Sequence, residues 1–267
     1  PYNEESYLLF TQNDYAPQKI QEKALSFIEN NKDVPFFMYY ASPLPHLPLQ
    51  APKEYVDKYR KILGEEEPYV GNDSYFPNRY PRATYAAMIT YLDRQLGELI
   101  KKLKEKGIYE NTVIIFSSDN GPANYGPSKE AGSTAGLKGR KVDIYQGGVV
   151  VPFIVKWKNK VGANKIDSTS ILTTVDLLPT FSKLAGVDVP KDYKIDGEDI
   201  ISIFDNKPFK REKPLFWEWR FPNTNNNHWA EGAIRKGDYK LLFNTKINRT
   251  ELINKFLRPS PTGNIFN

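Results

Sequence analysis

Residues 112–121, which read Thr-Val-Ile-Ile-Phe-Ser-Ser-Asp-Asn-Gly, decide the fold class. The β-branched and aromatic residues of 112–117 predict a central strand of a parallel sheet, because such strands are covered on both faces. Ligands of open α/β sheets bind where the strands end, and this strand ends at Asp119 and Asn120. Their carboxylate and amide oxygens are hard ligands suited to Ca²⁺ or Mg²⁺. The same residue types also form ordinary turns, so both interpretations stay open for this segment alone.

Helical and strand patterns alternate on both sides of this segment. Apolar spacing predicts helices over 17–31, 82–106 and 173–186, and further strands over 36–41 and 149–157. This order is typical of an α/β fold with a mostly parallel sheet flanked by helices. Strand patterns then follow at 215–219, 230–235 and 239–244, which predicts a small C-terminal antiparallel β subdomain. We therefore expect one domain over 1–208 and a second over 209–267.

Composition limits the classes of function. The 267 residues include no Cys, which excludes disulfides, thiolate metal sites and a cysteine nucleophile within them. The 37 basic and 32 acidic residues are interspersed, so the net charge of +5 predicts no nucleic-acid partner. The apolar runs 36–41 and 149–155 are far shorter than the roughly 18 residues of a membrane span. Residues 1–6 resemble a trimmed or fragmentary start, without an initiator Met or a charged-then-apolar leader.

Two further positions of the predicted sheet could carry chemistry. His46 follows the predicted strand 36–41 on a loop with three prolines, which would hold its imidazole in a fixed direction. Lys138 and Lys141 lie in a loop punctuated by glycines, where an ammonium group could bind an oxyanion. Taken singly, a surface histidine and solubilising lysines are equally consistent with the pattern.

Together these residues resemble the type I sulfatases, the arylsulfatase family of the alkaline phosphatase superfamily. The resemblance rests on the order and spacing of Pro45-His46-Leu47-Pro48, Ser118-Asp119-Asn120-Gly121-Pro122, Leu137-Lys138-Gly139-x-Lys141, Tyr145-x-Gly147-Gly148 and Val151-Pro152-Phe153. Further similarity runs through 81–88, 92–93, 176–180 and 233–241. It therefore covers nearly the whole chain and implies an alkaline-phosphatase-like fold.

The resemblance implies hydrolysis of sulfate esters, on a sulfated carbohydrate or an aryl sulfate, by a formylglycine beside a calcium ion. It places Asp119 and Asn120 among the metal ligands, and His46 and Lys141 as catalytic residues that contact the sulfate. A cation and fixed cationic donors stabilise charge on the transferring oxygens, and a His or Lys near the bridging oxygen can protonate the leaving alcohol. Family analogy also suggests a periplasmic or extracellular location.

Parts of the family pattern do not occur in this sequence. The nucleophile motif, Cys or Ser followed by x-Pro-x-Arg, and the paired Asp residues that complete the calcium site belong upstream of the matched region. Ser74-x-x-Pro77-x-Arg79 has one residue too many and is interpreted as a decoy. Gln146 and Val150 replace a frequent Glu and a frequent Arg, which affects local scaffold contacts. We therefore expect a C-terminal portion that is inactive without the missing N-terminal half of the enzyme.

Two other functions stay open at this point. A phosphoester or phosphonate hydrolase of the same superfamily would use the same metal and lysine positions. A non-catalytic glycan-binding remnant would fit if the natural chain began near Pro1.

A group of aromatic and basic residues near an Asn-rich stretch could contact sugar rings: Trp217, Trp219, Arg220, His228 and Trp229. Leu215 alternates with the first two tryptophans along one face of a predicted strand. Burial under the small sheet is therefore the preferred interpretation.

Overall fold

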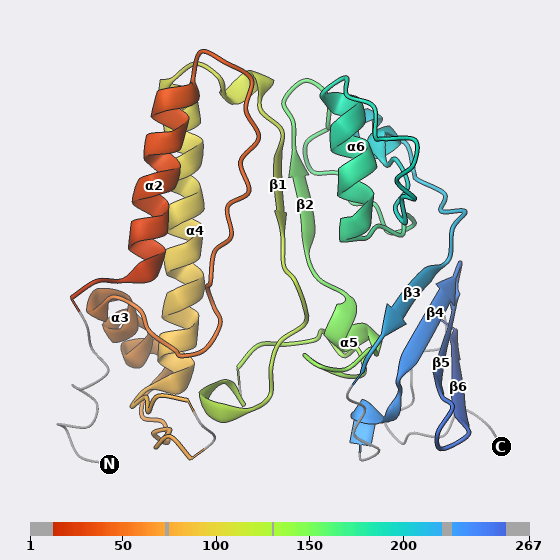
Figure 1. The fold of residues 1–267 in the computed structure, drawn as a ribbon. Helices are drawn as coiled ribbons and strands as arrows, with labels where there is room; N and C mark the ends of the chain where they lie inside the picture. The colour runs from red at the N-terminus through yellow and green to blue at the C-terminus, as the bar shows by residue number, and fades with distance from the viewer. Residues whose placement is uncertain (1–12, 73–74, 130, 221–225, 255–267) are drawn as a thin grey trace. The chain divides into compact units, whose positions relative to one another are not determined.

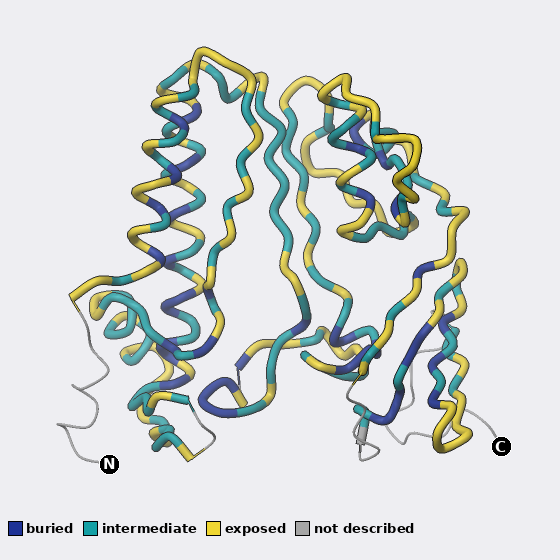
Figure 2. Tube along the Cα trace, viewed as in Figure 1, coloured by how far each residue is buried: buried dark blue, intermediate teal, exposed yellow. Residues whose placement is uncertain are grey.

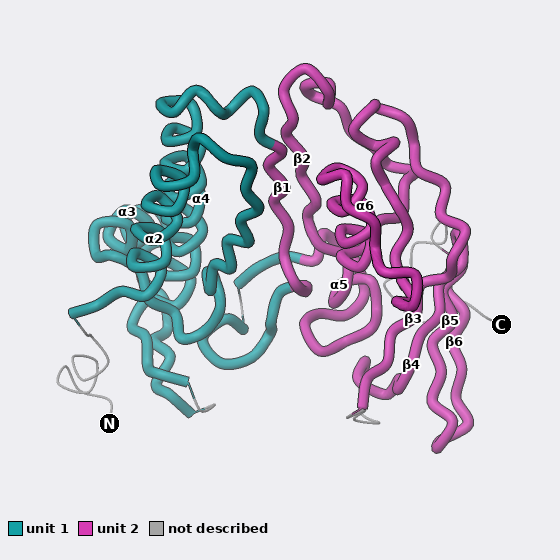
Figure 3. Tube along the Cα trace, turned by 45° about the horizontal axis from the view of Figure 1, so that its top comes forward, with its two compact units in different colours: residues 1–112, 122–133 teal, residues 113–121, 134–267 magenta. Residues whose placement is uncertain are grey.

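The computed structural model describes residues 13–72, 75–129, 131–220 and 226–254. The chain divides into two compact units, coloured separately in Figure 3. Unit 1 comprises residues 1–112 and 122–133, and unit 2 comprises residues 113–121 and 134–267. The predicted domain boundary near residue 208 falls inside unit 2 and stays a prediction.

Unit 1 is helical. It contains α2 (Ala16–Asn31), α3 (Lys53–Leu63) and α4 (Pro81–Glu105), with the short 3₁₀ helices η1 (Tyr109–Asn111) and η2 (Gly126–Ser128). α2 lies alongside α4 (Figure 1), and buried residues recur along both helices (Figure 2). Two buried glutamines join them: Gln21 Nε2 donates to Gln95 O at 2.9 Å, and Gln95 Nε2 donates to Pro17 O at 2.8 Å. The helices predicted over 17–31 and 82–106 are confirmed.

The predicted strand over 36–41 is wrong, because this segment belongs to no strand of the structure. It is nevertheless half-buried at every second residue, and Phe37 and Tyr39 are 68% and 83% exposed. Phe36 instead packs edge-on against Phe27 of α2, with ring centroids 5.5 Å apart. An apolar run indicates burial, but a strand also needs a neighbour that pairs its backbone N–H and C=O groups.

Unit 2 begins with β1 (Ile114–Ser117), which pairs with β2 (Phe153–Lys156). Ile114 lies opposite Lys156 and Ser117 opposite Phe153, so the two strands are antiparallel. The predicted parallel pairing is therefore wrong for these strands, and both sheets within the described residues are antiparallel. A short apolar run does not encode strand direction, and the long connection between β1 and β2 is compatible with either direction.

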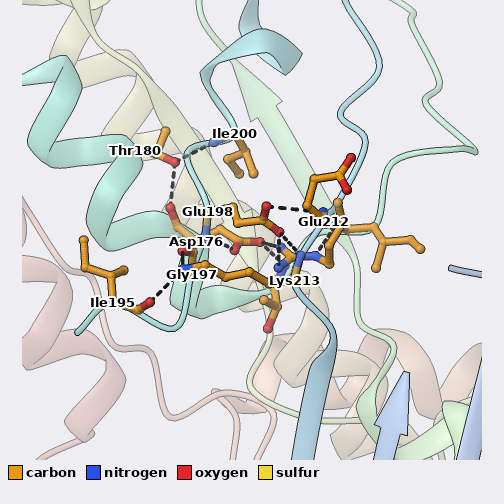
Figure 4. A network of polar contacts seen from close by, with 11 residues as sticks. Asp176, Thr180, Ile195, Gly197, Glu198, Ile200, Glu212 and Lys213 are labelled. Atoms are coloured by element: carbon orange, nitrogen blue, oxygen red, sulfur yellow. Dashed lines mark hydrogen bonds and ion pairs between the residues drawn. The ribbon is translucent and has the colours of Figure 1, made fainter. Parts of the chain in front are cut away.

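The short helix α5 (Gln146–Val149) precedes β2. The segment after β2 forms η3 (Thr174–Asp176), α6 (Leu177–Leu184) and η4 (Ile201–Asp205) around the buried Asp176. Thr173 and Asp176 form a capping box at the start of η3, which runs directly into α6. The Asp176 carboxylate accepts the backbone N–H of Glu198 (Figure 4), at a distance of 2.9 Å. The same carboxylate forms an ion pair with Arg211. Asp176 is fully buried and satisfied by these contacts, so we interpret this charged network as structural.

The C-terminal sheet consists of β3 (Leu215–Glu218), β4 (Gly232–Lys236), β5 (Tyr239–Asn244) and β6 (Arg249–Asn254) in that spatial order. All its pairings are antiparallel, which confirms the predicted small C-terminal sheet. Trp229, in η5 (Asn226–Trp229), is fully buried in the hydrophobic cluster beneath it. Trp217 and Trp219 are partly buried and pack against that cluster, as the preferred interpretation expects; sugar contact by these rings stays untested.

No helix in the described parts of the chain is both long enough and apolar enough to cross a membrane.

Candidate functional site

The turn formed by residues 118–121, called the 118–121 turn, follows β1 and carries Asp119 and Asn120. Asp119 is exposed, and its Oδ1 accepts the backbone N–H of Asn120 at 2.9 Å. The amide Nδ2 of Asn120 donates to Gly121 O at 3.0 Å. Within the described chain, these contacts leave Oδ2 of Asp119 and Oδ1 of Asn120 without a hydrogen bond. Two hard oxygen atoms of adjacent residues are thus available for a ligand.

Lys141 lies in a tightly turned segment, residues 138–148, called the 138–148 loop. The Asp143 carboxylate accepts the backbone N–H of Arg140 at 2.7 Å, and Asp143 N donates back to Arg140 O at 2.9 Å. Val142, the residue after Lys141, has a φ of 70°, which is unfavourable for a β-branched side chain. Such strain is held only where surrounding contacts impose it, and it is concentrated at functional sites.

The 118–121 turn and the 138–148 loop meet through their backbones. Gly121 N donates to Gly148 O at 2.9 Å. A Cβ atom on Gly121 would lie 1.9 Å from Gly147 O, and one on Gly147 would lie 2.0 Å from Gly139 O. Only glycine allows these close approaches. The sequence therefore brings the candidate metal ligands and the lysine loop together in unit 2.

The two lysines of this loop differ in their surroundings. Lys138 Nζ donates to Tyr145 OH and to Glu251 Oε1, both at 3.0 Å. Burial opposes the charge on Lys138, but these two hydrogen bonds outweigh it and raise the pKa of its ammonium group. Lys138 therefore ties the loop to β6.

Lys240, from the C-terminal sheet, also contacts the 138–148 loop. Lys240 of β5 is 2% exposed and its Nζ donates to Ile144 O and, at 3.4 Å, to Gln146 Oε1. Its Nζ also lies 4.1 Å from the centre of the Trp217 ring. Burial, and to a lesser extent the charge of Arg235, lower the pKa of Lys240 to about 7. Of the two residues that depart from the family pattern, Gln146 thus has Lys240 as a partner, whereas Val150 is 47% exposed.

His46 belongs to unit 1, on the proline-rich loop before α3. Leu44 and Leu47 on either side of it are buried against Met88 and Tyr91 of α4. The imidazole Nδ1 lies 2.7 Å from Leu47 O, so a proton on Nδ1 would fix the ring's orientation. The loop thus holds this imidazole in place, as the sequence predicts.

The donor set suits part of a cation site. Ca²⁺ takes six to eight oxygen ligands, and Asp119 and Asn120 supply two of the right chemical type. No group of three or more His, Asp or Glu side chains with metal-binding geometry occurs among the residues that the structure describes. The residues therefore fit an oxygen-ligated cation as an incomplete set of ligands.

Asp143 and His228 escaped the sequence analysis as candidate site residues. Asp143 lies next to His228, which the sequence places only in an aromatic group, and the two are 85 positions apart. No spacing rule predicts a contact between such distant loops. Ser74, in the decoy motif, lies outside the described residues.

The chain belongs to the Sulfatase family, whose sequence profile matches residues 1–187. The profile described as N-sulphoglucosamine sulphohydrolase, C-terminal, matches residues 140–267. The resemblance inferred from the motifs is thereby confirmed at the level of the family.

Individual proteins agree with this assignment. The uncharacterized sulfatase YdeN of Escherichia coli K12 is 30% identical over 220 residues, which are 81% of this chain and 35% of YdeN. The N-acetylgalactosamine-6-sulfatase of Rattus norvegicus is 30% identical over 182 residues, 67% of this chain and 30% of the rat protein. The solved structure of Ps i-CgsB in complex with k-i-k-neocarrahexaose is 26% identical, with a TM-score of 0.74 over 95% of this chain and 51% of that one. The chain thus spans about a third to a half of these relatives and has a sulfatase-like fold.

Proposed function

We propose that the protein containing this chain hydrolyses sulfate esters on a sulfated carbohydrate. The observation that carries the proposal is the backbone junction between the 118–121 turn and the 138–148 loop, with Gly121 N donating to Gly148 O at 2.9 Å. It joins a pair of cation-ligating oxygens to a loop with a cationic side chain. The family supports the reaction class. Two similar proteins support a carbohydrate substrate, because one is named N-acetylgalactosamine-6-sulfatase and the other was solved in complex with k-i-k-neocarrahexaose.

In this proposal Asp119 and Asn120 hold part of a Ca²⁺ site, with Mg²⁺ as the less favoured ion. When bound, the cation would neutralise charge on the sulfate oxygens, and a formylglycine elsewhere in the protein would supply the nucleophile. Lys141 would bind a sulfate oxygen through its ammonium group. Its counterpart Lys138 is committed to Tyr145 and Glu251, so we do not assign it to the substrate.

His46 would act on the leaving group. Its Nδ1 is placed beside Leu47 O, so Nε2 is the nitrogen that would give a proton to the bridging oxygen. The buried leucines on both sides keep the ring in place during this transfer. Export to the periplasm or the outside of the cell is also part of the proposal, on family analogy alone.

The test uses the natural protein that contains this chain and three 4-nitrophenyl compounds: the sulfate, the phosphate and a phosphonate monoester. We expect turnover of the sulfate, loss of that turnover in a chelator, and recovery with Ca²⁺. Preferred turnover of the phosphate or phosphonate would replace the sulfatase by a phosphoester or phosphonate hydrolase. Binding of sulfated sugar without turnover of any ester would instead support a non-catalytic glycan-binding role.

A further inference from the structure

A histidine and a buried aspartate meet beside the loop that carries Lys141. Nδ1 of His228 lies 2.7 Å from Oδ1 of Asp143. The Asp143 side chain is 5% exposed, whereas that of His228 is 32% exposed. Both facing atoms are buried, and the ring N–H is not aligned for a hydrogen bond, so the contact is an ion pair when the imidazole is protonated. A buried carboxylate oxygen needs such compensation.

The pair is anchored on both sides. The other oxygen of Asp143 accepts the backbone N–H of Arg140 at 2.7 Å, inside the turn that contains Lys141. His228 precedes the fully buried Trp229, whose Nε1 donates to Tyr145 OH at 3.0 Å. His228 and the neighbouring Trp229 therefore each contact the 138–148 loop, at Asp143 and at Tyr145.

One edge of the ring remains accessible. The His228 side chain is 32% exposed, and Nδ1, but not Nε2, is among the buried side-chain N and O atoms of the described residues that have no hydrogen-bond partner. Asp143 is two residues from Lys141, so their Cα atoms are at most about 7 Å apart. An imidazole that a carboxylate orients through one nitrogen presents its other nitrogen to a ligand. A pair with only a stabilising role would need no such accessible edge.

We propose that His228 contacts the substrate. Its Nε2 binds a hydroxyl or anionic substituent of the sugar that carries the scissile sulfate, and Asp143 is the positioning residue. This assignment rests on the proposed function, because that function places the sulfate at Lys141. A sulfated sugar has hydroxyl and anionic groups next to the reacting ester, whereas a simple aryl sulfate has none.

The test compares His228→Ala and His228→Gln with wild type in the natural protein. The substrates are N-acetylgalactosamine 6-sulfate, k-i-k-neocarrahexaose and 4-nitrophenyl sulfate. For the sugar that is cleaved, His228→Ala should raise KM by about 10- to 100-fold while kcat changes by less than roughly threefold. The loss in kcat/KM on the aryl sulfate should be at least about tenfold smaller. His228→Gln should recover part of the affinity, because its amide N–H can still donate.

Lys210→Ala is the matched control, since it removes a cation whose side chain is 91% exposed in the same unit. It should alter neither KM nor kcat. Equal losses on sugar and aryl sulfate for His228→Ala would indicate a scaffold role and overturn the assignment, as would unchanged kinetics. If only the aryl sulfate is cleaved, the carbohydrate substrate and the role of His228 both fail while the sulfatase activity stands. If no ester is cleaved, the proposed function itself fails.

Discussion

Gly121→Ala tests the junction between the two halves of the candidate site. The added Cβ would lie 1.9 Å from Gly147 O and 2.9 Å from Gly147 C, both backbone atoms. Ordinary contacts begin at 3.4 Å, so one backbone must move by about 1.5 Å. Overpacking of this kind costs about 1–3 kcal/mol, and a misplacement near 1 Å can lower the rate about 100-fold. No rotamer change can relieve the clash, because neither partner is a side chain.

The assay measures kcat/KM on 4-nitrophenyl sulfate and the free energy of unfolding in urea for the natural protein. Gly97→Ala in α4 is the matched control, because no atom lies within 4 Å of its Cβ position. We expect the control to be neutral or stabilising by up to about 1 kcal/mol, since alanine favours a helix over glycine. If Gly121→Ala matches the control in both activity and stability, the two segments do not form the close junction that we describe.

Three other perturbations test separate parts of the structure. Arg211→Leu should lower the free energy of unfolding by about 3–5 kcal/mol, because it leaves the buried Asp176 carboxylate unpaired. Lys183→Ala is the control, and urea unfolding should show a much smaller loss for it because its ion pair is exposed. Equal losses in the two variants would contradict the structural role of the network around Asp176. The pKa of Lys240 is lowered to about 7, so between about pH 7 and pH 10 the folded state binds fewer protons than the unfolded state. The free energy of unfolding of the wild type should therefore rise in this range by up to about 1.4 kcal/mol per pH unit, compared with Lys240→Met. A parallel pH dependence of the two proteins would show that Lys240 keeps an ordinary pKa. The chain expressed by itself should release no sulfate from 4-nitrophenyl sulfate with excess Ca²⁺, because the nucleophile motif does not occur in it, and metal-dependent turnover would show a nucleophile within these residues.

The sequence predicts the long helices and the C-terminal sheet because their signals are local. Gly107 ends α4 with a φ of 71°, and Gly237, with a φ of 56°, lies between β4 and β5. The segment 36–41 and the direction of β1 depend instead on which strands lie next to them, which no local pattern encodes. α3 was not predicted, and the structure gives it no fully buried residue.

In the candidate site too, local motifs could be predicted from the sequence and long-range contacts could not. Asp119, Asn120 and Lys141 come from recognisable motifs, and the glycines that join their loops lie in the same motifs. The hydrogen bond from Lys138 to Glu251 joins residues 113 positions apart and could not be inferred from sequence spacing. The assignment of His46, Asp119, Asn120 and Lys141 to catalysis and metal binding remains a prediction.

The most direct test of that assignment measures bound calcium and sulfate turnover on the same preparations of Asp119→Ala, Lys141→Ala and Lys138→Ala in the natural protein. Asp119→Ala should lose both calcium and turnover, because its carboxylate is a cation ligand. Lys141→Ala should keep its calcium and lose about 10²- to 10³-fold in turnover, as expected for the loss of a preorganised donor to the sulfate. Full activity in Lys141→Ala together with a loss in Lys138→Ala would contradict the assignment of the sulfate-binding lysine, and unchanged calcium in Asp119→Ala would contradict the metal site.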